Sequence, residues 1–323
     1  MLELSLTFLD LHFSSGAKLP RWLGSAFRGG LGQHLKRISC YHPMRECKSC
    51  DRAQVCLFYA TYEKPVAKQG HAPPPRPIIL VPPFFGKEME FAHEAKLELK
   101  LLMFGEYVHH FPYVILALQQ FGSCGLGDVR HLGQNKFEVV EARCRFSGKP
   151  VYDGDRIYPE NMEIMDVVDF PLIDQKHLRI GFRTPIELPL GFPPSPEHLL
   201  TLIRRRLVLF VNEYGNGEKV PEFKVSGKVE TVAKHYHRLV GCSQRSGKRE
   251  FWNCWTGIAD YEFEELDETG RWLLGVGREL GAGAKSSFGL GFFDIWNPER
   301  KEEERPGRYI SDPGADFETT KGP

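Results

Sequence analysis

Long hydrophobic runs are absent from this 323-residue sequence, and so is an excess of charge of either sign. No apolar stretch reaches 18 residues, so no transmembrane helix is expected. The first nine residues, MLELSLTFL, lack a basic segment and alternate like a strand. This pattern does not fit a secretory signal peptide and predicts a cytoplasmic protein. In that compartment the eight cysteines are not expected to form structural disulfides.

The formal net charge is zero, which neither favours nor excludes a nucleic-acid partner. The distribution of charge is more informative. Basic residues gather at 204–206, 234–238 and 245–249, and acidic residues gather at 262–268 and in the C-terminal tail. Segregated charge can hide a basic groove under a neutral total, although each cluster could equally be a solvated surface. The length and a hydrophobic content of 41% predict two packed domains.

Periodicity in the first half predicts the order β-α-β-β-α-β. Residues 2–13 alternate like a strand, and apolar residues from Trp22 to Ile38 recur at helical spacing in a helix expected to open at 18–20. Strands are expected at 78–81, 97–104 and 137–142, with a helix ending near Gln120 before the last of them.

The second half repeats this order, which predicts an α+β fold of two tandem ferredoxin-like modules. The expected elements are a strand at 176–188, a helix from the N-cap Ser195 to Gly215, strands at 223–236 and 250–264, a helix capped by Asp267, and a strand at 292–296. The expected divisions are a first module at 1–147 with a four-cysteine insert at 40–56 and a Pro-rich connector at 65–77, a second module at 148–297, and a disordered polar tail at 298–323.

Two glycine-rich segments lie at matching places in the two halves, each between a helix and a strand. They are GSCGLG at 122–127 and GAGAKSSFGLG at 281–291. Glycine allows positive φ and close approach of the backbone to a ligand. With Lys285, Ser286 and Ser287, the second loop offers amides, hydroxyls and a cation to a phosphate. The repetition indicates an internal duplication.

The ordered set of these features resembles a known family over roughly residues 1–296. The features are LPRWLGSAFRGGLG at 19–32, the cysteine segment that follows, the glycines of 122–127, and FGLG at 288–291. They resemble the RAMP (repeat-associated mysterious protein) superfamily of CRISPR antiviral defence. Within it, the chain looks like the CRISPR repeat-processing endoribonucleases.

The resemblance implies a hydrolase that cleaves the repeat RNA of a CRISPR transcript without a catalytic metal. Attack of the ribose 2′-OH on the adjacent phosphate would leave a cyclic phosphate and release a guide RNA. The alternative is a non-catalytic RAMP subunit that holds guide RNA beside other subunits of a CRISPR effector complex. A ferredoxin-like metal-binding protein unrelated to RNA is a third interpretation, which leaves the duplicated loop unexplained.

Cleavage of this kind needs a base, a proton donor and cations near the reacting phosphate. The resemblance places a histidine on or just after the first helix, where the chain has His34 and His42, with Lys36 and Tyr41 nearby. His235 and His237 are the alternatives, and a site without a histidine also stays open. The chain has Gln33 and Leu280 at two places where many relatives carry a histidine.

Contacts to RNA are expected from basic side chains and from the second glycine-rich loop. The candidates are Arg28, Arg238, Arg245, Lys248, Arg249, Gly283, Lys285, Ser286, Ser287, Gly289 and Gly291. Trp252 and Trp255 are either core residues or stacking platforms. Because their positions differ by three, an odd number, they are expected on opposite faces of a strand.

Four cysteines form the most specific local pattern. Cys40, Cys47, Cys50 and Cys56 are separated by six, two and five residues. Four thiolates suit either a structural zinc ion or a [4Fe–4S] cluster, and the spacing resembles the iron–sulfur loop of certain DNA glycosylases. The sequence does not choose between the two metals, and unliganded thiols are the third possibility. The intervening residues are polar, so the segment is expected to need a metal to hold its shape.

Overall fold

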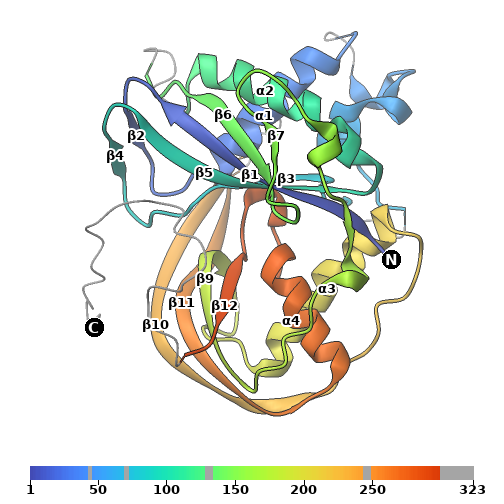
Figure 1. Ribbon diagram of the computed structural model, residues 1–323, viewed down its shortest axis with the longest axis vertical. Coiled ribbons are helices and arrows are strands. Elements are labelled where there is room, and N and C mark those ends of the chain that lie inside the picture. Colours follow the sequence, from blue (N-terminus) through green and yellow to red (C-terminus); the bar gives the residue numbers. More distant parts are fainter. Residues whose placement is uncertain (43–45, 69–72, 128–133, 243–248, 299–323) are drawn as a thin grey trace.

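The structure is a computed structural model that describes residues 1–42, 46–68, 73–127, 134–242 and 249–298 (Figure 1). Two of the predicted RNA contacts, Arg245 and Lys248, lie outside the described residues, as does the predicted tail beyond 298. In the described part of the chain, every helix is too short or too polar to cross a lipid bilayer.

Two antiparallel sheets form the framework of the protein (Figure 1). The first sheet has the order β3-β5-β1-β6-β7, with β8 paired to β1, and the second has the order β10-β11-β9-β12. The strands of the first are β1 (Glu3–Phe13), β3 (Ile78–Val81), β5 (Ala95–Phe104), β6 (Glu138–Cys144), β7 (Pro150–Tyr152) and β8 (Met165–Asp166). Those of the second are β9 (His177–Glu187), β10 (Val225–Cys242), β11 (Arg249–Leu266) and β12 (Phe293–Trp296). The strands β2 (Ala17–Leu19) and β4 (Met89–Phe91) pair with each other in a separate two-stranded sheet.

Within the described ranges, four α-helices complete the two units. They are α1 (Gly24–Ser39), α2 (Phe111–Cys124), α3 (Pro196–Tyr214) and α4 (Glu268–Leu280). Short helical turns are η1 (Cys47–Ser49), η2 (Ala53–Val55), the π-helix η3 (Tyr59–Glu63), η4 (Gly105–His110), η6 (Pro159–Asn161), η7 (Val167–Asp169) and η8 (Ser286–Phe288). In each unit, the four strands of the β-α-β-β-α-β order lie in the sheet in the order second, third, first, fourth. This is the arrangement of a ferredoxin-like module. The predicted pair of ferredoxin-like modules is therefore confirmed.

The starts of α3 and α4 follow the predicted capping chemistry. The Ser195 hydroxyl accepts a hydrogen bond from the His198 amide at 3.2 Å, and the Asp267 carboxylate accepts one from the Gly270 amide at 2.7 Å. The predicted start of α1 at 18–20 is wrong, because residues 17–19 pair with β4 instead. Pairing with a distant strand overrides the local helical spacing there, and α1 begins only at Gly24.

The first sheet is buried on both faces, with a different core on each. Leu4 and Leu6 of β1 belong to the core shared with the second module, whereas Leu9, Leu11 and Phe13 pack with α1 and α2. The first sheet accordingly lies between these two helices and the second module (Figure 1).

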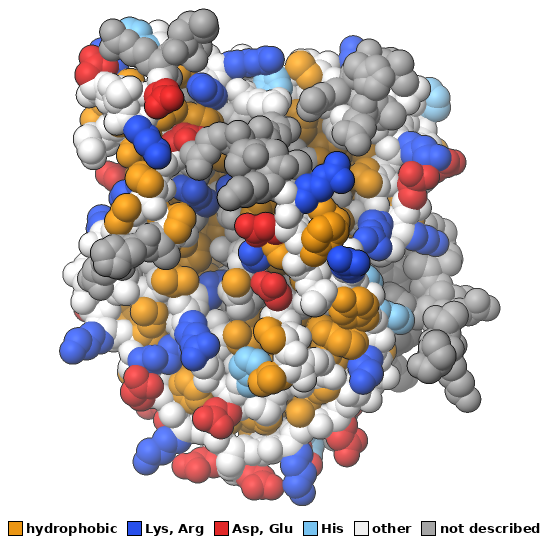
Figure 2. Space-filling model, turned by 180° about the vertical axis from the view of Figure 1, so that it is seen from behind, with side chains coloured by type: hydrophobic (Ala, Val, Ile, Leu, Met, Phe, Trp, Pro, Cys, Tyr) orange, Lys and Arg blue, Asp and Glu red, His pale blue; other side chains and the backbone are white. Residues whose placement is uncertain are grey.

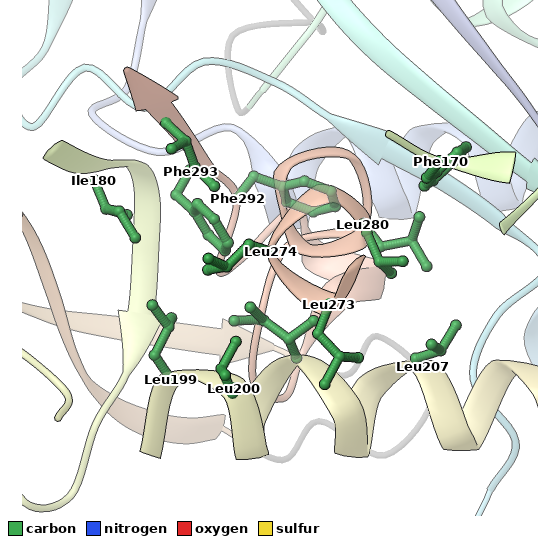
Figure 3. Close-up of a cluster of buried hydrophobic side chains, with 14 of the residues drawn as sticks. Phe170, Ile180, Leu199, Leu200, Leu207, Leu273, Leu274, Leu280, Phe292 and Phe293 are labelled. Atoms are coloured by element: carbon green, nitrogen blue, oxygen red, sulfur yellow. The ribbon is translucent and has the colours of Figure 1, made fainter. Parts of the chain in front are cut away.

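The shared core continues into the second module, where α3 and α4 bring leucines against aromatic residues of the last strand (Figure 3). The first sheet extends to Asp166, because β7 pairs with β6 and β8 pairs with β1. The predicted boundary at 147 therefore falls inside the β6–β7 connection, since hydrogen bonding of the sheet edge continues past it.

A buried ion pair joins the two modules through this shared core. The Lys100 ammonium of β5 donates to the Glu279 carboxylate at 3.2 Å and to the Glu279 carbonyl at 2.8 Å. Burial favours the neutral acid, but the charges of Lys100, Arg145 and Arg278 outweigh it and lower the pKa of Glu279.

Replacing Glu279 with Gln should destabilise the protein by about 3–5 kcal/mol, because the buried Lys100 charge loses its carboxylate partner. The carboxylate stabilises the fold above its unfolded-state pKa, near 4.5, and this contribution is lost as the pH falls through the lowered folded-state pKa. Urea denaturation at several pH values measures both effects.

The matched control is Glu88→Gln, which removes a surface carboxylate 2.9 Å from Lys18. That change should cost less than about 1 kcal/mol. A loss at Glu279 as small as that of the control would show that the buried pair does not hold the modules together.

Candidate nucleic-acid interface

The glycine-rich loop at 281–291, which joins α4 to β12, is held by one buried arginine of α3. Arg206 is 3% exposed, and its guanidinium donates to four backbone carbonyls, one at the end of α4 and three in the loop. They are those of Leu280 at 2.8 Å, Gly283 at 2.8 Å, Ala284 at 3.2 Å and Leu290 at 2.8 Å. Burial lowers the pKa of Arg206 to about 9, which leaves it protonated at neutral pH. The loop is thus wrapped around a fixed cation.

The two ends of this loop are packed, which corrects two predicted RNA contacts. A Cβ at Gly291 would lie 2.0 Å from the Ala282 carbonyl oxygen, and one at Gly289 would lie 3.0 Å from Pro82. Both glycines also have positive φ and are buried. Their missing side chains allow close protein packing and do not expose backbone to a ligand.

The tip of the loop, residues 283–288, is partly exposed and touches the first module. The Phe288 ring lies 4.7 Å from the Arg28 guanidinium of α1 and 4.8 Å from the Trp252 ring of β11. Arg28 is also 5.4 Å above the Tyr62 ring, and burial lowers its pKa. Arg28, one of the predicted RNA contacts, is consequently a half-buried cation at the module contact.

Lys285 lies at the loop tip in a left-handed conformation, with φ of +62°. Its ammonium is 3.3 Å from a Glu250 carboxylate oxygen and 4.7 Å from the centre of the Trp252 ring. Ser286 and Ser287 beside it are half-buried. An anionic ligand would have to compete with Glu250 for this lysine.

The outer face of the β10–β11 hairpin carries a row of alternating cationic and aromatic side chains. We name it the hairpin ladder, and its members are Lys234, Tyr236, Arg238, Phe251, Asn253 and Trp255. Tyr236 pairs with Trp255 across the strands, and Arg238 pairs with Asn253. Tyr236 is 52% exposed and Phe251 is 56% exposed, which is unusual for aromatic side chains in a folded sheet.

Contacts within the hairpin ladder hold its side chains in place. The Arg238 guanidinium lies 4.4 Å over the Phe251 ring, and the Lys234 ammonium lies 5.9 Å from the Trp255 ring. The Tyr236 hydroxyl donates to the Asn253 amide oxygen at 2.7 Å. Lys and Arg side chains beside hydrophobic ones are visible on the side of the molecule where this hairpin lies (Figure 2). Such a surface offers π-faces for stacking and cations for phosphates.

The inner face of the hairpin is apolar and packs on the loop. Trp252 is 3% exposed and clusters with Leu290, whereas Trp255, on the face of the hairpin ladder, is half-buried and packs against the shared core. The prediction that the two tryptophans face opposite sides is confirmed. His237 also points inward, 4.7 Å from the Phe84 ring, and burial lowers its pKa to about 4. The predicted contact Arg249 is exposed at the start of β11.

The four predicted catalytic residues are divided by burial. His34 is 4% exposed, stacks on Phe121 at 5.8 Å, and its Nδ1 has no hydrogen-bond partner in the described part of the chain. Burial and the Arg37 charge lower the pKa of His34. His42 and Tyr41 are exposed after the end of α1. Lys36 is half-buried, 5.5 Å from the Phe58 ring.

The four predicted metal ligands lie next to these residues. Cys40, Cys50 and Cys56 line one cavity of about 100 Å³ together with Tyr41 and His42. Within the described ranges, no three His, Cys, Asp or Glu side chains meet closely enough to hold a metal ion as they stand. The metal site stays a prediction.

The sequence analysis did not single out three residues that are important in the structure. Tyr236 and Phe251 alternate with inward-facing residues, so a period-2 reading of β10 and β11 could have assigned them to the outer face. Arg206 was counted in a basic cluster with Arg204 and Arg205. Its helical position between the apolar Ile203 and Leu207 was the available signal that it faces the core.

Sequence comparison supplies the family. A protein of Archaeoglobus fulgidus, named only as an uncharacterized protein, is 37% identical over 280 residues, which cover 86% of this chain and 92% of that protein. Two family models match, the AF_1859 N-terminal domain at residues 3–164 and the AF_1859 C-terminal domain at residues 178–295. The chain belongs to the AF_1859 family. The first matched range contains β1 to β7 and the second contains most of the second module, and β8, which pairs with β1, lies between the two ranges.

Solved structures with the same fold include Cas6 (TTHB231) of Thermus thermophilus. Its product complex matches with a TM-score of 0.50 at 17% identity, covering 91% of this chain and 99% of that one. A second structure of the same protein matches with a TM-score of 0.50 at 14% identity, covering 92% and 99%. At this identity the likeness is one of fold, and it agrees with the double ferredoxin-like architecture of the present chain.

Replacing Arg206 with Met should leave the Leu280 carbonyl and three loop carbonyls without their donor and destabilise the protein by about 3–5 kcal/mol. Hydrogen exchange should accelerate at the amide of Ala282, which donates to the Gly291 carbonyl and closes the loop, and at the amide of Gly291, which donates to the Pro185 carbonyl of β9. The control is Arg205→Met on the exposed side of the same helix, which should change neither quantity. Equal protection of these amides from hydrogen exchange in both variants would show that Arg206 does not hold the loop.

Proposed function

We propose that this protein binds CRISPR repeat RNA through the hairpin ladder and processes it without a catalytic metal. The observation that carries the proposal is the exposed cation–aromatic ladder beside the glycine-rich loop. The shared fold with Cas6, which includes a product complex, supports the assignment to CRISPR RNA. A double ferredoxin-like fold alone does not specify a function.

The hairpin ladder suits single-stranded RNA. Base-paired RNA hides its base faces, whereas unpaired bases can stack on Tyr236 and Phe251. Arg238 and Lys234 lie on the same face as these rings and would follow the phosphates. Lys285 at the loop tip would extend this track, with RNA phosphate displacing the Glu250 carboxylate.

Cleavage requires a side chain that can exchange a proton with solvent-exposed RNA. Among the predicted catalytic residues, His42 and Tyr41 meet this condition, whereas His34 is enclosed by α1 and Phe121. We therefore assign the acid or base role to His42 and a packing role to His34. Attack of the 2′-OH would leave a 2′,3′-cyclic phosphate and a 5′-OH.

The second candidate function is retention of guide RNA without cleavage, in company with other subunits of an effector complex. The burial of His34 and His237 favours it, because both imidazoles are enclosed and burial lowers the pKa of each, which disfavours the protonated form that donates a proton to a leaving group. The hairpin ladder serves both candidates equally, so RNA binding alone does not separate them.

Incubation with cognate repeat RNA in EDTA separates the two functions. Cleavage to a product with a cyclic-phosphate end is expected, and His42→Ala should lower its rate by about 10²–10⁴ while sparing binding. His177→Ala, in an exposed histidine of β9, is the control and should leave the rate unchanged. Tight binding of RNA that remains intact would instead establish the non-catalytic candidate.

The binding surface is tested with Phe251→Ala. Loss of one stacked base should cost about 1–3 kcal/mol, which is roughly a 5- to 150-fold rise in Kd for the repeat RNA. Tyr113→Ala, in an aromatic side chain of α2 that is 48% exposed, is the matched control and should not change Kd. Equal affinity of both variants in fluorescence anisotropy would remove the hairpin ladder from the interface.

A further inference from the structure

The four-cysteine segment after α1 has a backbone built of short turns that end at cysteines. Cys40 follows the last residue of α1, and its amide donates to the Lys36 carbonyl. The turn η1 ends at Cys50 and the turn η2 ends at Cys56. Three of the four thiols thus occupy the residue immediately after a helical turn.

This segment lacks a hydrophobic core of its own. Among its described residues, 40–42 and 46–56, only Ala53 is buried. Tyr41 is 76% exposed and Val55 is 85% exposed. Isolated turns of three residues are not stable in water, because ordering the chain costs more than the few hydrogen bonds return. Something other than apolar burial has to hold the segment.

Three of the four cysteines share one cavity, and the remaining one is hydrogen-bonded to one of them through the backbone. Cys40, Cys50 and Cys56 line the cavity of about 100 Å³. Cys47 is the first residue of η1. Its carbonyl accepts a hydrogen bond from the Cys50 amide at 3.4 Å, which links the backbone of Cys47 to that of Cys50. The turn η1 also contacts η2 and η3. All four cysteines are half-buried, and none is in a disulfide.

We propose that Cys40, Cys47, Cys50 and Cys56 bind one metal centre through four thiolates, and that this centre replaces the missing core of the segment. A zinc ion and a [4Fe–4S] cluster both accept four cysteine thiolates. Binding would require the turns to move so that the thiols approach one another from their present positions. The centre would be structural, because four protein ligands leave no open position for a substrate.

The segment is connected to the module contact through Tyr62. The Ala60 amide donates to the Cys56 carbonyl at 3.0 Å, and the chain then enters η3. Within η3, the Tyr62 ring stacks on Phe58, and its hydroxyl donates to the Arg28 carbonyl at 3.1 Å. Metal binding would therefore fix the residues that support Arg28, whether or not the protein binds RNA.

The test uses the full chain, purified without an affinity tag that binds metal, both in air and under anaerobic conditions. Elemental and acid-labile sulfide analyses should give either one zinc per chain, or four irons and four sulfides with a brown colour. The first result identifies zinc and the second identifies a cluster. Less than one tenth of either amount, even after reconstitution with Zn²⁺ or with Fe²⁺ and sulfide, would overturn the proposal.

Variants connect the metal to these cysteines. Cys50→Ser should abolish stoichiometric binding, whereas Cys124→Ser, in an exposed cysteine of α2, should retain it. Metal retained in full by Cys50→Ser would overturn the assignment. If Cys50→Ser does not fold, X-ray absorption of the wild-type chain decides instead. Four sulfur neighbours at about 2.3 Å support the site, and nitrogen or oxygen neighbours contradict it.

Discussion

The contact between Arg206 and four carbonyls, one at the end of α4 and three in the glycine-rich loop, is the constraint on which the candidate interface depends. A guanidinium is planar and always has five donors to satisfy, so a backbone that wraps it adopts one shape. That shape needs positive φ at several positions, which explains the glycines at the two ends of the loop. The loop is therefore rigid for a structural reason, before any ligand is considered.

The fixed loop in turn positions the contact between the modules and the hairpin ladder. Phe288 from the loop tip lies against Arg28 of α1, and Leu290 lies in a cluster with Trp252 of β11. Since Trp252 is on the inner face of β11, anchoring it fixes the position of the outer face as well. The matching loop of the first module is secured differently. There, the Asn135 side chain bonds to the backbone of Lys18 and to the Leu126 carbonyl.

The fold was predictable from the sequence because its signals are local and periodic. The caps at Ser195 and Asp267 and the alternation in β1 act over a few residues, and they specify where elements begin and which face is buried. The start of α1 was not predictable in this way. Residues 17–19 pair with a strand about 70 positions further along the chain, and a pattern read over a few neighbouring residues cannot predict such a pairing.

The candidate site was predictable only in part, for a related reason. The cation at Lys285 and the glycines were correctly recognised as a distinctive loop, but burial depends on what packs against each residue in three dimensions. Gly289 meets Pro82 from the first module, and His34 meets Phe121 from α2, contacts that no local pattern encodes. Arg206 differs from Arg205 only in the direction it faces on α3.

One large core is common to both halves of the chain. Leu4 and Leu6 from the first strand fill the same interior as Phe210 and Phe293 from the second module. If the chain arose by duplication, neither copy is now expected to fold stably without the other. Cleaving the chain between them would expose the shared hydrophobic core on both fragments, which favours aggregation. Recombination among AF_1859 relatives should therefore exchange whole chains more readily than halves.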